Sequence, residues 1–279
     1  MSCLILWLKK NEHLFLPHCF GLHHLLKVTA MRSLLITLFL CGSVGMILAQ
    51  GSAFGIKGGV TASRQRWDNN FDRDMLLRYH GIVFVESLAE DTRFSLFAQA
   101  GYHIKGSAIR TPRSAVTGSG GTIFTVPAQQ ISFEYRNASI TVGAKQHLDL
   151  DLGDKKLYYL FGLRGEYTIN TLLGPRIPNE YDIFTIYYPI PEFVRKINYG
   201  ITVGGGIHVP FDDLVGVLLE FTVNPDFSYQ YDQPPLENII NPNPWAPRGN
   251  ITLPQRRSTN LAFELSLGFR FLRKVIYVD

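Results

Sequence analysis

A strict alternation in residues 260–271 constrains the fold of this chain more than any other feature. Large apolar side chains occupy every odd position from 261 to 271, and small, polar or charged residues occupy the even positions. A period of two predicts a β-strand with two chemically different faces. The stretch is longer than an average soluble strand and matches a tilted strand across a bilayer, which needs roughly 9–11 residues. Because Glu264 and Arg270 lie on the polar face, the pattern indicates lipid on one side and a polar barrel interior on the other.

Seven further segments alternate in a similar way. They cover residues 53–62, 79–88, 93–107, 131–148, 157–170, 198–209 and 214–224. In the second strand, 79–88, residues 82–85 are all apolar, so the facing of that strand stays open. In the fourth, 131–148, the apolar positions change from odd to even near residues 136–139, which predicts a β-bulge.

The connections between these segments alternate in length. Long connections cover 64–77, 108–129, 172–196 and 225–257, and short turns cover 89–92, 149–156 and 210–213. Long external loops, short periplasmic turns and an even number of strands are typical of outer-membrane barrels. Adjacent strands are then antiparallel, and closure leaves no strand edge without a partner. The predicted fold is all-β: an eight-stranded antiparallel up-and-down transmembrane β-barrel with long external loops and short periplasmic turns.

The first 50 residues have the form of a targeting segment rather than of a barrel. In residues 31–50, a basic residue precedes an apolar run that ends in Ala49-Gln50, as in a secretory signal peptide. We predict that residues 1–30 are a non-native extension, with Met31 as the true start, and that 31–50 are the signal peptide. Residues 51–279 are then the outer-membrane β-barrel domain.

Cysteine content and charge agree with export. All three cysteines lie within residues 1–50, so the exported chain would form no disulfides. The same segment holds four of the 27 basic and one of the 23 acidic residues, which leaves a net charge of +1 for the rest. The basic character belongs mostly to the segment that is removed, and we predict no nucleic-acid partner.

Three stretches carry a family resemblance: residues 54–60 (FGIKGGV), 97–102 (FAQAGY) and 263–271 (FELSLGFRF). With them, the chain resembles the PorT-like outer-membrane β-barrel family of Gram-negative bacteria. The resemblance covers the whole chain after the signal peptide and rests on a repeating pattern rather than on a catalytic motif. It implies an eight-stranded barrel in the cell outer membrane and no particular biochemical activity. Phe271 resembles the terminal aromatic signal that the barrel-assembly machinery reads, although eight further residues follow it here.

Charged residues recur on the predicted interior face of the strands. The predicted charge network consists of Lys57, Lys145, Arg164, Glu166, Glu220, Glu264 and Arg270, and Lys105 and His208 lie on the same faces. The interior of an eight-stranded barrel is just filled by side chains, and buried charges there must pair. We therefore predict a closed interior of mutually neutralising charges. A proton path or a conduit for small ions is the alternative.

The sequence gives little support for catalysis or for metal binding. The four histidines after residue 50, at positions 80, 103, 147 and 208, are scattered over different strands and predict no metal site. A catalytic site would need a Ser, a His and a carboxylate that orients the His; Ser107 and His103 share a strand face, but no convincing triad can be traced. We predict a non-enzymatic protein without a cofactor. Its predicted partners are outer-membrane lipid, the barrel-assembly machinery during insertion, and an unidentified protein bound by the loops, among which residues 181–193 are unusually apolar.

A soluble barrel is the rival interpretation. Turning a barrel inside out preserves the period of two, so alternation alone is also compatible with a secreted, lipocalin-like eight-stranded barrel that binds an apolar ligand inside. The polar faces carry charges and several glycines, which would make a poor apolar pocket. Together with the alternating connection lengths, this favours the outer membrane.

Overall fold

The computed structural model describes residues 52–68, 73–87, 93–117, 121, 123–148, 155–174, 188–241 and 249–273. The chain divides into two units, Met1–Gln50 and Gly51–Asp279, and all described residues belong to the second. The predicted extension (1–30) and signal peptide (31–50) lie outside the described residues and stay predictions. No helix in the described part of the chain is long and apolar enough to span a membrane.

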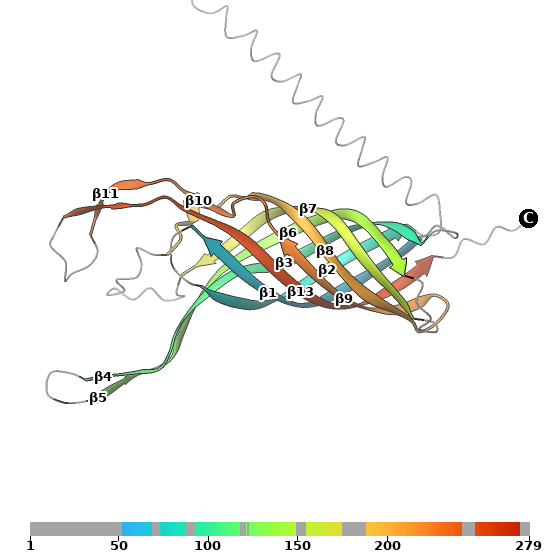
Figure 1. Ribbon diagram of the computed structural model, residues 1–279, viewed down its shortest axis with the longest axis horizontal. Coiled ribbons are helices and arrows are strands. Elements are labelled where there is room, and N and C mark those ends of the chain that lie inside the picture. Colours follow the sequence, from blue (N-terminus) through green and yellow to red (C-terminus); the bar gives the residue numbers. More distant parts are fainter. Residues whose placement is uncertain are drawn as a thin grey trace, which may run out of the picture. The chain divides into compact units, whose positions relative to one another are not determined.

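Eight antiparallel strands close into a ring in the second unit (Figure 1). They are β1 (Ser52–Trp67), β2 (Asp74–Ser87), β3 (Phe94–Thr111), β6 (Gln129–Leu148), β7 (Lys156–Leu173), β8 (Ile197–Pro210), β9 (Val215–Pro225) and β13 (Arg256–Arg273). Each strand pairs with the next along the chain, and β1 pairs with β13 from Ser52↔Arg273 to Trp67↔Ser258. The predicted eight-stranded up-and-down barrel is confirmed.

The two ends of the ring differ in what they carry. Ser52 pairs with Arg273 on one side and with Ser87 on the other, so β1 begins where β2 and β13 end. We call this the terminal end of the ring. The opposite end, which we call the loop end, carries the connections after β1, β3, β7 and β9, of which those after β3, β7 and β9 are much longer than the connections at the terminal end. The predicted rhythm of long and short connections therefore holds except after β1, where the connection, residues 68–73, is as short as the one after β2.

Side chains alternate between the interior and the outer surface of the ring. In β13, the outward-facing Leu265, Leu267 and Phe269 are 52%, 59% and 50% exposed, whereas Glu264 and Ser266 on the other face are buried. In a soluble protein the apolar residues would be the buried ones. This distribution is therefore inverted, with an apolar outer surface and a polar interior.

Strand β2 settles the facing that the sequence left open. Val83 and Val85 point outward and are exposed, whereas Ile82, Phe84 and Glu86 are buried in the interior. The alternation is weak here because two apolar side chains fill the interior near the terminal end. Glu86, the last inward-facing residue of β2, brings a carboxylate into the interior.

The predicted β-bulge is present near the expected position, but it lies in β7 rather than in β6. The register between β6 and β7 shifts where Arg136 pairs with Asn170 and Asn137 with Thr168, so the extra residue is Ile169 of β7. Strand β6 itself keeps its odd positions inward, because Phe133 is as buried as Asn137. The apolar positions change in the sequence because the interior becomes aromatic near the loop end.

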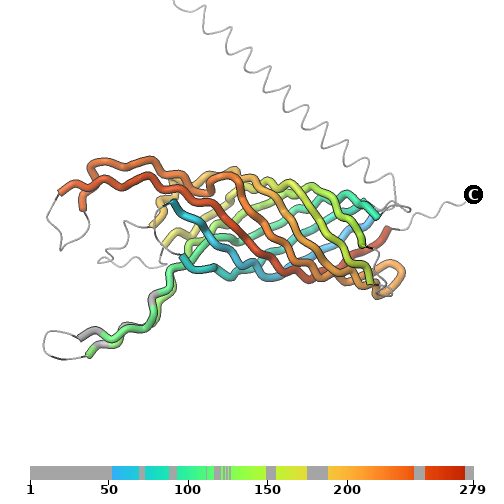
Figure 2. Tube along the Cα trace, viewed as in Figure 1, coloured from blue at the N-terminus to red at the C-terminus, as the bar shows by residue number. Residues whose placement is uncertain are grey.

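Two of the predicted long loops contain strands. Segment 108–129 forms the hairpin β4 (Ser114–Thr117) and β5 (Ile123–Val126), and Figure 2 follows the chain from β3 through it into β6. Segment 225–257 contains the others: β10 (Tyr231–Gln233), β11 (Leu236–Ile240) and β12 (Asn250–Leu253). Away from a bilayer both faces of a hairpin meet similar surroundings, so pairing there needs no alternating pattern.

The other two predicted long loops differ from their predicted bounds or are only partly described. Segment 64–77 is shortened because β1 continues to Trp67 and β2 begins at Asp74. Most of segment 172–196 lies outside the described residues. Its described end contains the 3-10 turn η2 (Pro191–Phe193).

Candidate functional site

The interior of the ring holds charged side chains in three groups, ordered here from the terminal end to the loop end. In the first group, Lys57 forms an ion pair with Glu220, and Tyr158 donates a hydrogen bond to the same carboxylate over 2.8 Å. These side chains come from β1, β9 and β7, so the contact crosses the interior rather than following neighbouring strands. The side chains of Lys57 and Glu220 are almost fully enclosed.

A second carboxylate of the first group collects three donors. Glu86 accepts hydrogen bonds from Ser95 Oγ at 2.7 Å, from Arg270 Nε at 3.3 Å and from Lys145 Nζ at 3.5 Å. The Lys145 ammonium also lies 4.8 Å from the centre of the Tyr158 ring. Cation–π contact of this kind offsets part of the cost of burying the ammonium.

Two histidines form the middle group. His103 Nδ1 lies 2.6 Å from Glu264 Oε1, and His80 contacts Thr61 Oγ1 at 2.9 Å and Ser266 Oγ at 2.8 Å through its two ring nitrogens. The two imidazole rings stack with their centres 5.7 Å apart. Every polar atom of His80 thus has a partner, which holds the ring in one orientation.

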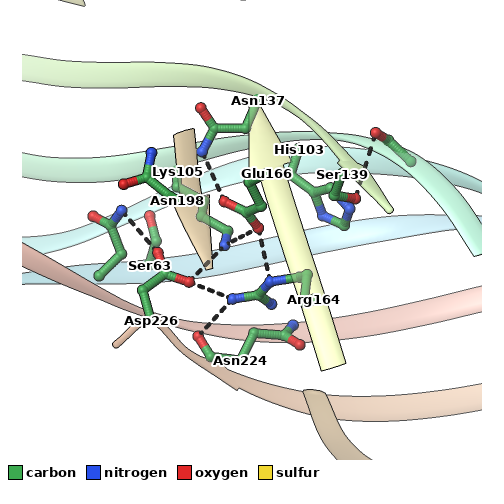
Figure 3. A network of polar contacts seen from close by, with 12 residues as sticks. Ser63, His103, Lys105, Asn137, Ser139, Arg164, Glu166, Asn198, Asn224 and Asp226 are labelled. Atoms are coloured by element: carbon green, nitrogen blue, oxygen red, sulfur yellow. Dashed lines mark hydrogen bonds and ion pairs between the residues drawn. The ribbon is translucent and has the colours of Figure 1, made fainter. Parts of the chain in front are cut away.

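The group nearest the loop end is a closed set of two cations and two carboxylates (Figure 3). Glu166 contacts Lys105 at 2.5 Å and Arg164 Nε at 2.8 Å, and Asp226 contacts Arg164 Nη2 at 2.5 Å and Lys105 at 3.5 Å. Asn137 donates to Glu166 at 2.9 Å. Each charge therefore has two partners of opposite sign, as a buried ion needs.

The three groups balance in charge. The basic members are Lys57, Lys105, Lys145, Arg164 and Arg270, and the acidic members are Glu86, Glu166, Glu220, Asp226 and Glu264. Every one of the ten has at least one ionisable partner. In the described interior these ten residues form a polar filling with no net charge when the histidines are neutral.

The structure places all seven predicted network residues in the interior. Lys57, Lys145, Arg164, Glu166, Glu220, Glu264 and Arg270 are each 8% exposed or less. It brings Lys57 to Glu220 and Arg164 to Glu166, whereas Glu264 meets a histidine rather than another predicted charge. Lys145 and Arg270 meet only through Glu86, which sequence reasoning missed.

Asp226 is the other acidic residue that sequence reasoning missed. It follows the last residue of β9, Pro225, where the alternation ends. Every second residue of β9 up to Asn224 points inward, and continuing this alternation by two positions would have identified Asp226. Glu86 was missed for a different reason, since its strand carries apolar residues on both faces.

The candidates for other chemistry are not brought together. Ser107 Oγ donates to Gln65 Oε1 at 2.7 Å, while His103 binds Glu264, so these two residues have separate partners. His208 is buried and its Nε2 has no hydrogen-bond partner. Among the described residues, no group of three or more His, Cys, Asp or Glu side chains is placed to hold a metal ion.

One ion cluster lies at the loop end beyond the ring. Asp232 of β10 accepts hydrogen bonds from Arg257 Nε at 3.0 Å and from Arg195 Nη2 at 2.5 Å. Burial alone would raise the pKa of Asp232, but these two guanidinium groups outweigh it and hold the pKa below its ordinary value. The cluster ties β10 to β13 and to the segment before β8.

The sequence matches no protein-family model and no curated protein sequence. Among solved structures, the chain is similar to outer-membrane protein OprG from Pseudomonas aeruginosa (7% identity, TM-score 0.43), with 80% of this chain and 97% of that chain covered. It is also similar to neisserial surface protein A (12%, 0.38; 78% and 97% covered) and to the outer-membrane protease OmpT from Escherichia coli (10%, 0.35; 80% and 97% covered). At these values the likeness carries no functional information.

Proposed function

We propose that residues 51–279 form an integral barrel of the Gram-negative outer membrane with a structural or binding role at its loop end. The inverted distribution of side chains carries this proposal: apolar residues cover the outside of the ring, and paired charges fill the inside. Such an outer surface is stable against lipid hydrocarbon and unfavourable in water. Outer-membrane lipid is therefore the proposed environment of the ring, and the barrel-assembly machinery its proposed partner during insertion.

The proposed barrel is closed. Eight strands enclose a space that side chains fill, and here they include long charged residues such as Arg164 and Lys105. Displacing one of them would leave its partner as a buried charge without compensation, which is costly. The proposed activity therefore lies in the segments beyond the ring, where a protein partner would bind.

The proposed role is non-enzymatic and needs no cofactor. The separate partners of Ser107 and His103 support this, since a nucleophile and its base must be within hydrogen-bond reach of each other. Membership of the PorT-like family is part of the same proposal, and it rests on the sequence pattern alone.

A secreted lipocalin-like barrel receives less support. Its ligand site would require an apolar interior. The interior of this ring instead contains the ten charges described above, together with buried polar residues such as Gln65, Asn198 and Thr202. An apolar ligand would have to displace ion pairs to enter.

Two measurements on bacteria that express the full chain test the proposal. A carbonate wash should leave the protein in the membrane fraction. Because all three cysteines lie in residues 1–50, a cysteine introduced later reports on topology if the signal peptide is removed. Ser114→Cys, at the loop end, should react with an impermeant thiol reagent on intact cells, and Asp213→Cys, in an exposed turn at the terminal end, should react only after permeabilisation. Release by carbonate would refute the membrane placement, and the opposite labelling would invert the topology.

A further inference from the structure

The loop end of the ring contains a buried arginine that has no acidic partner among the described residues. Arg73, just before β2, is 7% exposed, and its guanidinium carbon lies 4.1 Å from the centre of the Trp67 ring and 4.3 Å from that of Phe133. Its Nε and Nη1 atoms are buried and have no hydrogen-bond partner. Two aromatic rings thus hold a cation in place while donors at its edge remain unused.

The charges around Arg73 do not neutralise it. Burial lowers the pKa of Arg73 to about 10, and within the described part of the chain the other groups that act on it are Tyr135, Arg256 and Tyr231. At neutral pH the two tyrosines are uncharged and Arg256 is a second cation. Arg73 therefore stays protonated in a place where a positive charge is costly unless an anion is present.

Further unused donors lie on the adjoining strands, in the row of Trp67 and two positions along β10 from it. Trp67 pairs with Ser258, and Ser258 pairs in turn with Tyr231 of β10. Trp67 Nε1, Ser258 Oγ and Gln233 Nε2 are buried and have no hydrogen-bond partner, and Tyr231 holds the Gln233 amide by donating to its Oε1 at 2.5 Å. A fixed guanidinium, with unused N–H and O–H donors on the adjoining strands β1, β13 and β10, is the chemistry that recognises an oxyanion.

We propose that Arg73, with Trp67, Ser258 and Gln233, forms a binding site for a phosphate group that enters through the loop end. A phosphate presents acceptor oxygens in three directions and suits donors from several strands, whereas a carboxylate presents two oxygens in one plane. The phosphate belongs either to a soluble ligand or to a lipid headgroup. The site does not depend on the membrane placement of the ring, so the failure of one proposal leaves the other standing.

Tryptophan fluorescence tests the site directly. The chain has three tryptophans, at positions 7, 67 and 245, so Trp7→Phe with Trp245→Phe leaves Trp67 as the only indole. The full chain with these two changes, the parent, is refolded in phosphate-free detergent and titrated with millimolar inorganic phosphate at constant ionic strength. We expect a saturable change in Trp67 emission. Its absence would overturn the proposal.

Variants of the parent assign the response to Arg73. Arg73→Gln should raise the phosphate concentration at half-saturation by roughly ten- to a hundredfold, the loss expected for hydrogen bonds to a charged group. Arg66→Gln removes an exposed arginine from the same end of β1 and should leave half-saturation unchanged. Equal half-saturation in Arg73→Gln and the parent would overturn the site.

A second measurement, the effect of phosphate on the urea midpoint, tests the site even if Arg73→Gln does not fold. Phosphate bound only to the folded state should raise the urea midpoint of the parent, whereas acetate at the same concentration should not. Arg73→Met should show no phosphate-dependent rise. The proposal would be overturned if phosphate and acetate raised the urea midpoint of the parent equally. It would also be overturned if phosphate raised the midpoints of the parent and of Arg73→Met equally. Neither outcome depends on Arg73→Gln.

A titration with a phospholipid distinguishes a lipid headgroup from a soluble phosphate. Ser63, Gln65 and Trp67 are successive inward-facing positions of β1, so the site faces the interior of the ring at the loop end rather than the outer surface. Phosphatidic acid incorporated in the micelles should therefore leave the Trp67 emission unchanged, while soluble phosphate changes it. A response to the lipid alone would overturn entry through the loop end.

Discussion

At the scale of single residues, the pair Lys57–Glu220 offers the sharpest test of the interior. Lys57→Met should destabilise the folded barrel by about 3–5 kcal/mol, because Glu220 would remain as a buried charge that has lost its direct ion-pair partner and keeps only the hydrogen bond from Tyr158 and the more distant charge of Lys145. Replacing both by Met removes the charges together and should recover most of that loss. Urea unfolding in lipid vesicles measures the free energies of unfolding of Lys57→Met, Glu220→Met and the double variant. A double variant as unstable as the sum of the two single variants would show that the two side chains do not act as a pair.

Most of the charged residues in the interior were predictable from sequence, Glu86 and Asp226 being the exceptions, but the pairing of these residues was not. Parity along a strand placed Arg164 and Glu166 on the inner face, since alternation is a property of each strand alone. The partner of Lys57 comes from β9, which does not neighbour β1, and depends on side-chain length and on the register of every intervening strand. The fixed aromatic setting of Arg73 had no periodic signal, because it lies between two strands.

At the scale of the element, β13 should show a graded response to charge on its outer face. Leu265→Arg places a cation near the middle of the apolar band and should cost about 2–4 kcal/mol, whereas Leu261→Arg, on the same face closer to the loop end, should cost about 0–1 kcal/mol. Urea titration of barrels folded in vesicles measures both. Equal and small costs would mean that the outer face meets water.

The seam between β1 and β13 depends on a glycine. A Cβ atom added at Gly59 would lie 1.9 Å from the backbone oxygen of Leu265, whereas one added at Gly81 of β2 would meet nothing within 4 Å. Gly59→Ala should therefore destabilise the barrel by about 1–3 kcal/mol through overpacking, and Gly81→Ala should stay within about 0.5 kcal/mol of the parent. The same unfolding measurement compares them. A neutral Gly59→Ala would show that the seam can open without loss.

Strand existence was predictable from sequence wherever the two faces of a strand meet different surroundings. This holds for the central parts of all eight ring strands and fails beyond the apolar band, where β1 continues to Trp67 and where β4, β5 and β10 to β12 form. Backbone pairing continues in those segments without chemical contrast between the faces. Their sequences therefore resemble loops, and the sequence predicts them as loops.

At the scale of the whole molecule, the balanced interior predicts that the barrel does not conduct. Reconstituted in a planar bilayer, the protein should show no steady open channel, because the set formed by Lys105, Arg164, Glu166 and Asp226 crosses the interior. Current recordings over a range of voltages measure this. A large, stable conductance that fell when the interior was narrowed by mutation would refute the closed barrel.

The pairing of the first strand with the last sets the order in which the molecule can be made. Strand β1 leaves the ribosome first among the ring strands, yet its partner on one side, β13, is the last to be synthesised. Until β13 pairs with β1, a partly formed sheet has two long free edges, which are ready templates for wrong pairing and aggregation. Contacts between such distant parts of a chain also form slowly. A nascent chain that ends before Arg256 has every other ring strand and still cannot close, so quality control that recognises open sheet edges would detect the loss of β13.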